Sequence, residues 1–348
     1  MTMPAPSHLA SLTRVVVITA VVVTGMHLGA AIASPVLVGF ILAVIVTPIV
    51  HRLEERGLPS LAAVLAMTGV IAGIGLLLVA VFSLSLIELD SALPAYHNLL
   101  QAQLETLQAW LAEIGLMTSL ELPGAAAEPL LIPSLGEILA GLSILVIDFL
   151  VILIVAVFML LEVASIRGKL EKSLGTDART ELNRSAINLV AYAALRTKSG
   201  LATGIGIAIL LLLLGIDAPA LWAVLIVVLG YIPYFGRPIA SVPPIGLAWL
   251  QHGLPGALAV AGGIFAFDFA ARRLLLPYPA EQALRISPLV IILSVLAWGL
   301  VLGVPGLFLG APLALLIKAV LSSSEETRWL AILMEPSDDI EVTGERSE

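Results

Sequence analysis

Three ionisable side chains lie within or beside long apolar stretches of the sequence. Asp148 lies in the apolar stretch 137–161, Asp268 comes four residues before Arg272, and Arg237 lies within the Pro- and Gly-containing segment 232–238. A charged side chain at the centre of a membrane helix costs about 2.5–3.5 kcal/mol on insertion scales, so each needs a partner or a wet cavity. These positions are the candidates for ion, proton or solute chemistry.

Each charge has a structural alternative. Asp148 could carry a proton or cation, or be a helix-capping or hydrogen-bonded structural acid in an oligomer interface. For Asp268, an i to i+4 pair with Arg272 is the simpler interpretation than ion binding. The Arg237 fork could hold an anionic or hydroxyl-rich solute, a carboxylate such as Asp268, or free backbone carbonyls.

Proline and glycine interrupt two apolar stretches, residues 218–250 at 232–238 and residues 287–321 at 303–306. Each half is shorter than the roughly 20 residues that cross a bilayer, so each pair is either two thin spans or a re-entrant hairpin. Paired, interrupted segments of this kind favour a transport site. The predicted path residues are Pro233, Tyr234, Gly236, Arg237, Pro238 and Pro243 in the first stretch, and Pro305, Gly306, Gly310 and Pro312 in the second.

The composition excludes a single water-soluble fold. Of the 348 residues, 59% are hydrophobic and 12% charged, with a mean hydropathy of +1.08. So few charges cannot cover an apolar core of this size. We therefore predict an all-α polytopic integral membrane protein of about six to ten membrane segments, including the two broken hairpins, with amphipathic surface helices and the lipid bilayer as partner.

The positive charges predict the topology. No Lys or Arg lies between Arg56 and Arg167, whereas both ends of this gap are basic. Because cytoplasmic loops carry the excess of Lys and Arg, we expect both termini to be cytoplasmic and the middle of the gap to lie outside. The predicted regions are membrane segments one to three (1–87), an extracytoplasmic segment (88–136) with an amphipathic helix at about 93–116, segment four (137–161), cytoplasmic basic helices (162–198), a C-terminal membrane region with both broken hairpins (199–322) and a cytoplasmic acidic tail (323–348).

The first apolar run, from about Val15 to Ile32, has two interpretations. Ala31 and Ala33 would suit a signal-peptide cleavage site. A second apolar run follows Pro35 directly, which favours a tight helical hairpin around Ser34 and Pro35.

Motifs of several function classes are lacking in the sequence. There is no cysteine, no Gly-x-x-x-x-Gly-Lys-Ser/Thr loop, no His-Glu-x-x-His and no Gly-x-Ser-x-Gly. We therefore expect no enzyme, catalytic residue, metal or cofactor, and ATP-driven transport would need a separate subunit. The net charge of -8 argues against a nucleic-acid partner.

Three segments carry a resemblance to a known family. Residues 232–244, Ile-Pro-Tyr-Phe-Gly-Arg-Pro-Ile-Ala-Ser-Val-Pro-Pro, resemble the Ile-Pro-Tyr-x-Gly-x-x-Ile-x-x-x-Pro signature of the autoinducer-2 exporter (AI-2E) family. Residues 42–52 around Pro48, and residues 306–314 with their Gly-Ala-Pro-Leu-Ala end, resemble two further family motifs. The order and spacing match from about residue 13 to 322.

The resemblance implies a bacterial inner-membrane protein, homo-oligomeric, that moves a small polar solute. Named activities within the family include export of autoinducer-2 and exchange of sodium or lithium for protons, so a cation/proton antiporter is the alternative function. A structural membrane assembly that recruits partners is a further alternative. The family's usual Gly and His are missing from residues 277–288, and its pattern is not usually basic at Arg237, so the resemblance assigns no role to either.

Overall fold

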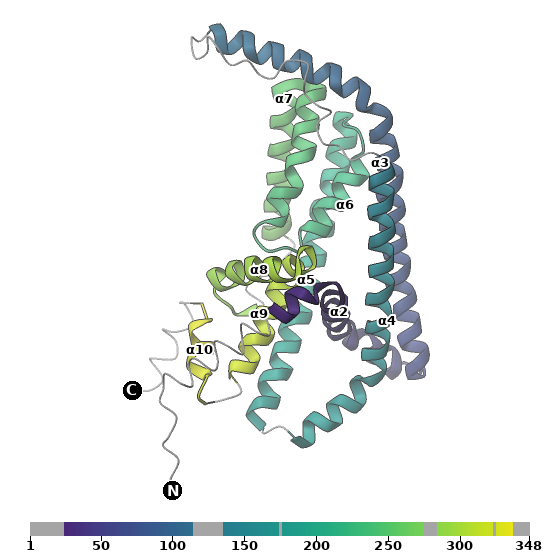
Figure 1. The fold of residues 1–348 in the computed structure, drawn as a ribbon, viewed down its shortest axis with the longest axis vertical. Helices are drawn as coiled ribbons and strands as arrows, with labels where there is room; N and C mark the ends of the chain where they lie inside the picture. Colours follow the sequence, from purple (N-terminus) through teal and green to yellow (C-terminus); the bar gives the residue numbers. More distant parts are fainter. Residues whose placement is uncertain (1–23, 114–134, 174–175, 275–283, 323–324, 337–348) are drawn as a thin grey trace. The chain divides into compact units, whose positions relative to one another are not determined.

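A computed structural model describes residues 24–113, 135–173, 176–274, 284–322 and 325–336. Across these residues the chain is helical and forms no strand, which confirms the all-α prediction (Figure 1). The helices are α2 (Ala30–Glu55), α3 (Ser60–Glu113), α4 (Leu135–Ser173), α5 (Thr176–Leu214), α6 (Pro219–Leu229), α7 (Gly236–Leu274), α8 (Pro288–Leu302), α9 (Val304–Ser322) and α10 (Arg328–Leu333).

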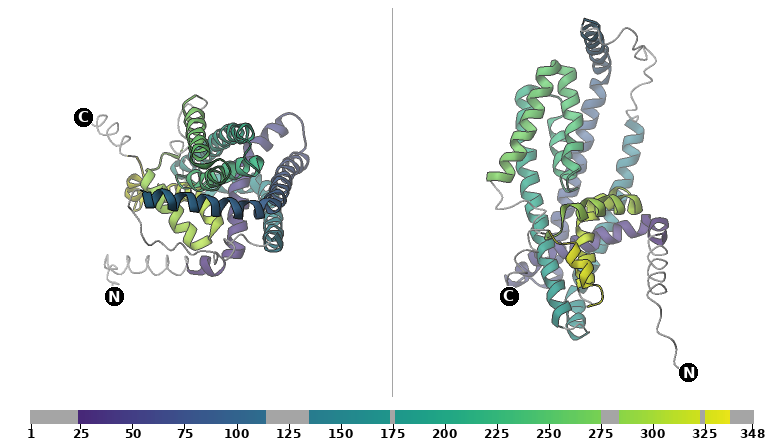
Figure 2. Two further views of the ribbon diagram at one scale, coloured as in Figure 1. Left: turned by 90° about the horizontal axis from the view of Figure 1, so that it is seen from above. Right: turned by 90° about the vertical axis from the view of Figure 1, so that its left-hand side faces the viewer.

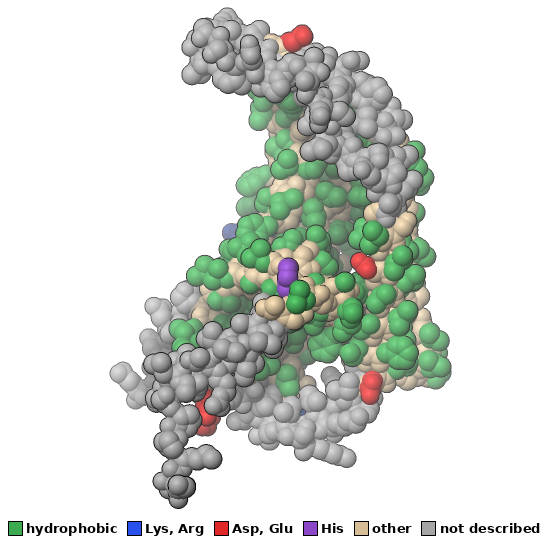
Figure 3. Space-filling model, in the orientation of Figure 1, with side chains coloured by type: hydrophobic (Ala, Val, Ile, Leu, Met, Phe, Trp, Pro, Cys, Tyr) green, Lys and Arg blue, Asp and Glu red, His purple; other side chains and the backbone are tan. Residues whose placement is uncertain are grey.

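Long apolar helices and an apolar surface confirm a multi-pass membrane protein. Six of the described helical segments are long and apolar enough to cross a bilayer. On the face drawn in Figure 3, hydrophobic side chains cover most of the described surface and charged ones are sparse. Leu77, Phe158 and Leu213, for example, are 62%, 68% and 80% exposed. Such a surface suits lipid, because in water each of these side chains would give up the free energy of burial.

The chain divides into two compact units, which are described separately. The first contains Met1–Thr68, Phe149–Ala193 and Ala280–Glu348, and therefore α2, α8, α9 and α10. The second contains Gly69–Asp148 and Ala194–Pro279, and therefore most of α3, the second half of α5, and α6 and α7.

In the first unit, α8 and α9 form a tight hairpin at the predicted break. The chain reverses at Gly303, whose φ of +68° favours glycine. Gly306 and Gly310 then let the two helices approach closely. A Cβ at Gly306 would lie 1.9 Å from the carbonyl oxygen of Trp298, and one at Gly310 would lie 2.5 Å from the Cα of Val295.

We expect Gly306→Ala to destabilise this hairpin by about 1–3 kcal/mol, the usual cost of overpacking. The clash is with backbone, which must shift. Gly299→Ala is the graded comparison, because its added Cβ would meet the end of the flexible Leu307 side chain at 2.4 Å. Thermal unfolding of the purified protein in detergent should give the larger drop in Tm for Gly306→Ala, and equal drops would contradict the packing described.

The predicted helical hairpin at Ser34 and Pro35 is wrong. Helix α2 begins at Ala30 and runs through Pro35, and Gly29 is its N-cap. Pro35 is the sixth residue of α2 and lies beyond its first turn, so it costs the helix one hydrogen bond, which the packing of this buried residue outweighs. Both residues are buried, and the Ser34 hydroxyl lies 3.4 Å from the carbonyl oxygen of Leu302. The signal-peptide alternative falls mainly on residues 1–23, outside the described residues.

In the second unit, α6 and α7 pack against each other, and the second half of α5 packs against both (Figure 2). Gly253, with φ 67° and ψ -162°, divides α7 into two arms, 236–252 and 254–274. The second arm packs on α5, where a Cβ at Gly206 would lie 2.3 Å from the ring of Phe267. The core of this unit includes Ile207, Leu211, Leu221, Ile226, Ala248 and Val260, all at most 2% exposed.

Helix α3 continues beyond the apolar segment Ser60–Leu89 as one helix to Glu113. Leu89, Ala92 and Leu99 pack against the core of the second unit, and Tyr96 is buried within it. This spacing puts one face of the extension on the protein, as the amphipathic pattern predicts. Residues 114–134, the rest of the predicted outer segment, lie outside the described residues.

Candidate functional site

The first predicted break lies between α6 and α7, in a turn that the backbone makes unusually tight. Tyr234 has a φ of 62°, a conformation that few residues other than glycine adopt. A Cβ at Gly236 would lie 1.7 Å from the carbonyl oxygen of Leu229. Pro233 is fully buried. The turn therefore holds the first residues of α7 in one orientation.

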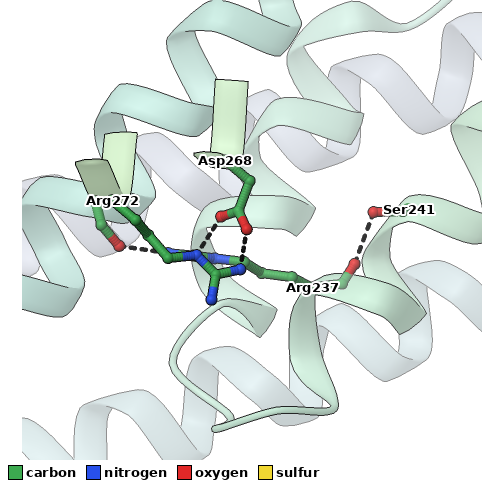
Figure 4. Close-up of polar contacts among 5 residues, drawn as sticks. Arg237, Ser241, Asp268 and Arg272 are labelled. Carbon is green, nitrogen blue, oxygen red and sulfur yellow. Dashed lines mark hydrogen bonds and ion pairs between the residues drawn. The ribbon is translucent and has the colours of Figure 1, made fainter. Parts of the chain in front are cut away.

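Arg237, in the first turn of α7, is the centre of a polar cluster. Its guanidinium donates to Asp268 of the second arm and to the Ser199 hydroxyl of α5. Asp268 also accepts from Arg272, and the dashed lines in Figure 4 join its two carboxylate oxygens to the arginine side chains. Ser241 donates to the Arg237 backbone carbonyl at 2.7 Å. Arg237, Asp268, Ser199 and Arg272 are named the Arg237 cluster below.

The Arg237 cluster is largely buried and carries a net positive charge. Arg237 and Asp268 are 12% and 15% exposed, whereas Arg272 is 51% exposed. Two guanidinium groups share one carboxylate, which leaves one positive charge. Of the sequence alternatives, the structure therefore pairs Arg237 with the carboxylate, and Asp268 with both Arg237 and Arg272. Planar guanidinium groups suit shared recognition of a carboxylate.

A second polar cluster joins α3 to the α5–α6 turn and α7. The Tyr96 hydroxyl donates to the carboxylate of Asp217, and the Gln251 amide donates to the same oxygen at 2.6 Å and to the Tyr96 hydroxyl at 3.2 Å. Trp222 Nε1 donates to the Asp217 backbone carbonyl at 3.0 Å. Three elements far apart in the sequence thus meet at Asp217.

Burial and the neighbouring Asp217 carboxylate raise the pKa of the Tyr96 hydroxyl well above its ordinary value. Tyr96 therefore remains protonated at physiological pH and remains a hydrogen-bond donor. The protonated Tyr96 hydroxyl can therefore donate its hydrogen bond to the Asp217 side chain.

We expect Tyr96→Phe to lower the free energy of unfolding by about 1.5–3 kcal/mol, the usual contribution of a hydrogen bond to a charged group. The carboxylate of Asp217 would keep only the bond from Gln251. A Tyr96→Phe, Asp217→Asn double variant should lose less than the sum of the two single losses, because the two residues share one bond. Strictly additive losses in denaturant unfolding would show that this bond does not stabilise the fold.

The structure does not place every predicted residue in one cluster. Asp148 is an exposed side chain on α4, next to Ile147 and Leu150, which are 60% and 53% exposed. It is not bonded to the Arg237 cluster in the described structure. The predicted path residues Pro305, Gly306, Gly310 and Pro312 lie on α9 in the first unit, and all but Pro305 are buried there.

Sequence reasoning missed Ser199 and the Tyr96–Asp217–Gln251 cluster. Ser199 lies just after the basic segment, at the start of an apolar run, and is 2% exposed. Asp217 is recognisable in the sequence as the first charge after the apolar run of α5, but only as a turn residue. Gln251 lies between two apolar runs, and nothing in its spacing connects it to Tyr96, 155 residues earlier.

Comparisons with known proteins agree with this architecture. The family model described as AI-2E family transporter matches residues 16–326. The AI-2 transport protein TqsA of Escherichia coli K12 is 27% identical over 317 residues, covering 90% of this chain and 92% of that protein. A putative transport protein of Haemophilus influenzae is 29% identical, with 92% and 94% covered. The putative transport protein YhhT of Escherichia coli K12 is 29% identical, with 91% of each covered. A match over nearly the whole membrane region shows that the chain belongs to the AI-2E transporter family.

Proposed function

We propose that this transporter facilitates the movement of a small polar solute across the bacterial inner membrane without an ATPase of its own. The observation that supports this most is the Arg237 cluster. It is a charged, hydrogen-bonded group at a Pro/Gly turn between two apolar helices. Placing a charged side chain within the membrane costs free energy, and the charged residues found there commonly line substrate pathways.

The turn between α6 and α7 is the proposed solute path. It consists of Pro233, Tyr234, Gly236, Arg237 and Pro238, with Pro243 in the next turn of α7. Helix α6 has 11 residues, too few to cross the bilayer alone, and broken helices of this kind line transport sites. The contribution of Pro305, Gly306, Gly310 and Pro312 to the path stays a prediction. The first solute to test is autoinducer-2, because the relative TqsA is named for its transport.

The alternative of a sodium or lithium/proton antiporter has less support. Asp268 already accepts hydrogen bonds from two arginines, whose charges oppose the binding of a cation. In the part of the chain that the structure describes, Asp148 is not bonded to the arginines of the Arg237 cluster, so it is the carboxylate to test for cation or proton binding. The structural-assembly alternative predicts no flux by the protein alone.

The proposed orientation follows the charges. Arg52, Arg56, Arg272 and Arg273 are expected on the cytoplasmic side together with both termini. A homo-oligomer is proposed on the strength of the family resemblance.

Reconstituted flux tests the proposal. Proteoliposomes with the purified protein should be screened for uptake of small polar metabolites, autoinducer-2 among them, and monovalent cations, without ATP. We expect at least one solute to move down its gradient. The Pro233→Ala, Gly236→Ala double variant should lose most of this flux at equal protein content. Gly246→Ala, also on α7 but with open space around an added Cβ, is the matched control. Absence of flux for every solute would contradict the function, and unchanged flux in the double variant would contradict the path.

A further inference from the structure

Thr203, on α5, has a hydroxyl that the fold does not use. The residue is 1% exposed, and among the described residues its Oγ1 has no hydrogen-bond partner. Burying a hydroxyl without a partner costs free energy, so such groups are rare and need an explanation.

Several other hydroxyls on the helices of this chain bond to their own helix. Thr47, Thr68, Ser83 and Ser241 each donate to the backbone carbonyl four residues earlier, at 2.7–2.8 Å. This local bond satisfies a hydroxyl inside an apolar helix. Thr203 does not make it, although the carbonyl of Ser199 is at the required spacing. Its hydroxyl is therefore available to something other than its own helix.

Two buried polar side chains precede Thr203 on the same face of α5. Arg196, Ser199 and Thr203 follow one another at helical spacing, and they are 5%, 2% and 1% exposed. Residues three and four apart lie on one helix face, with Cβ atoms about 5–6 Å apart. Ser199 accepts from Arg237, so this face of α5 meets the Arg237 cluster directly.

The charges near Ser199 and Thr203 indicate which class of ligand could bind there. Arg196 and Arg237 are positive, and Asp268 is shared between Arg237 and Arg272. A cation would be repelled here, whereas an oxyanion would receive bonds from hydroxyl and guanidinium donors. An uncharged polyol would gain the hydroxyl contacts without the charge.

We propose that Thr203, together with Ser199, Arg196 and Arg237, forms a binding subsite for the oxyanion group of the transported solute, a carboxylate or a phosphate. This rests on the proposed function and specifies its substrate class. Thr203 donates its free hydroxyl to the oxyanion, and the two arginines supply the positive potential. The solute then supplies the partner that Thr203 lacks.

Equilibrium binding tests the subsite without requiring transport. The whole protein in lipid nanodiscs is titrated by calorimetry with sodium acetate, sodium lactate or inorganic phosphate, and with glycerol and erythritol as uncharged probes. We expect an oxyanion to bind and the polyols not to bind. Thr203→Val should raise the Kd of that oxyanion about tenfold or more, since a hydrogen bond to a charged group is lost. Thr203→Ser should bind as the unmodified protein does.

Two controls separate this role from a structural one. Thr68→Val removes a hydroxyl that is bonded to its own helix, and it should leave the Kd unchanged. Thr203→Val should keep or raise the Tm, because it removes a buried hydroxyl that has no partner. Equal Kd values for Thr203→Val and the unmodified protein, or binding of polyols but not oxyanions, would overturn the subsite.

Failure of the subsite is distinguishable from failure of the function. If proteoliposomes carry a solute and Thr203→Val leaves its KM unchanged, the subsite is wrong and the transport function stands. If the unmodified protein carries no solute, the transport function fails, whatever the calorimetry shows.

Discussion

Replacing Arg237 by methionine is expected to lower solute flux at least tenfold and to destabilise the protein by about 2–3 kcal/mol. Breaking a buried ion pair usually costs about 3–5 kcal/mol, because one charge is left without its partner. The expected cost is smaller here, since Asp268 would still bind Arg272. The measurements are flux in proteoliposomes and unfolding in detergent, both at equal protein content.

Two further variants show whether the effect of Arg237→Met comes from the lost guanidinium or from lost stability. Arg237→Lys should restore only part of the flux, because an ammonium group cannot bind Asp268 and Ser199 as a planar fork does. An Arg237→Met, Asp268→Asn double variant should recover part of the stability but none of the flux. If Arg237→Met transports as the unmodified protein does, Arg237 has only a structural role at most.

Asp268→Asn is expected to reduce solute flux at least tenfold, whereas Asp148→Asn should leave it within about twofold. Asparagine cannot neutralise Arg237 and Arg272, so these two guanidinium groups would repel each other and the first turn of α7 would lose its position. Among the described residues, no hydrogen bond or ion pair joins Asp148 to the Arg237 cluster, so the solute path should not depend on it.

The same two variants test the antiporter alternative. In inverted vesicles, sodium should not dequench a pH-sensitive dye if the protein carries solute alone. Sodium-driven dequenching by the unmodified protein that Asp148→Asn or Asp268→Asn abolishes would support exchange and contradict the proposed function.

The sequence predicts the helices and both breaks well, because proline and glycine act locally. The turn before α7 and the reversal at Gly303 fall where these residues interrupt the apolar runs. Proline has no backbone N–H to donate, and glycine readily adopts a positive φ, so both effects follow from the residue type itself. The bond between Asp268 and Arg272 is likewise local, at a spacing of four residues.

Other features depend on contacts that no local pattern encodes. Helix α2 continues through Pro35 because tertiary packing outweighs the loss of one helical hydrogen bond. The link from Tyr96 to Asp217 joins residues 121 positions apart. The sequence leaves the partner of Arg237 open, since a guanidinium can bind a carboxylate, backbone carbonyls or a solute, and local spacing does not choose among them.

The most direct test of the solute path is thiol labelling at Tyr234. The chain has no cysteine, so Tyr234→Cys introduces the one thiol, in the turn between α6 and α7 where Tyr234 is 40% exposed. Leu213→Cys, on the apolar surface of α5, is the control. We predict that a membrane-impermeant thiol reagent blocks flux in Tyr234→Cys and that the solute slows this labelling, with neither effect in Leu213→Cys. Full labelling of Tyr234→Cys with unchanged flux would contradict a path through this turn.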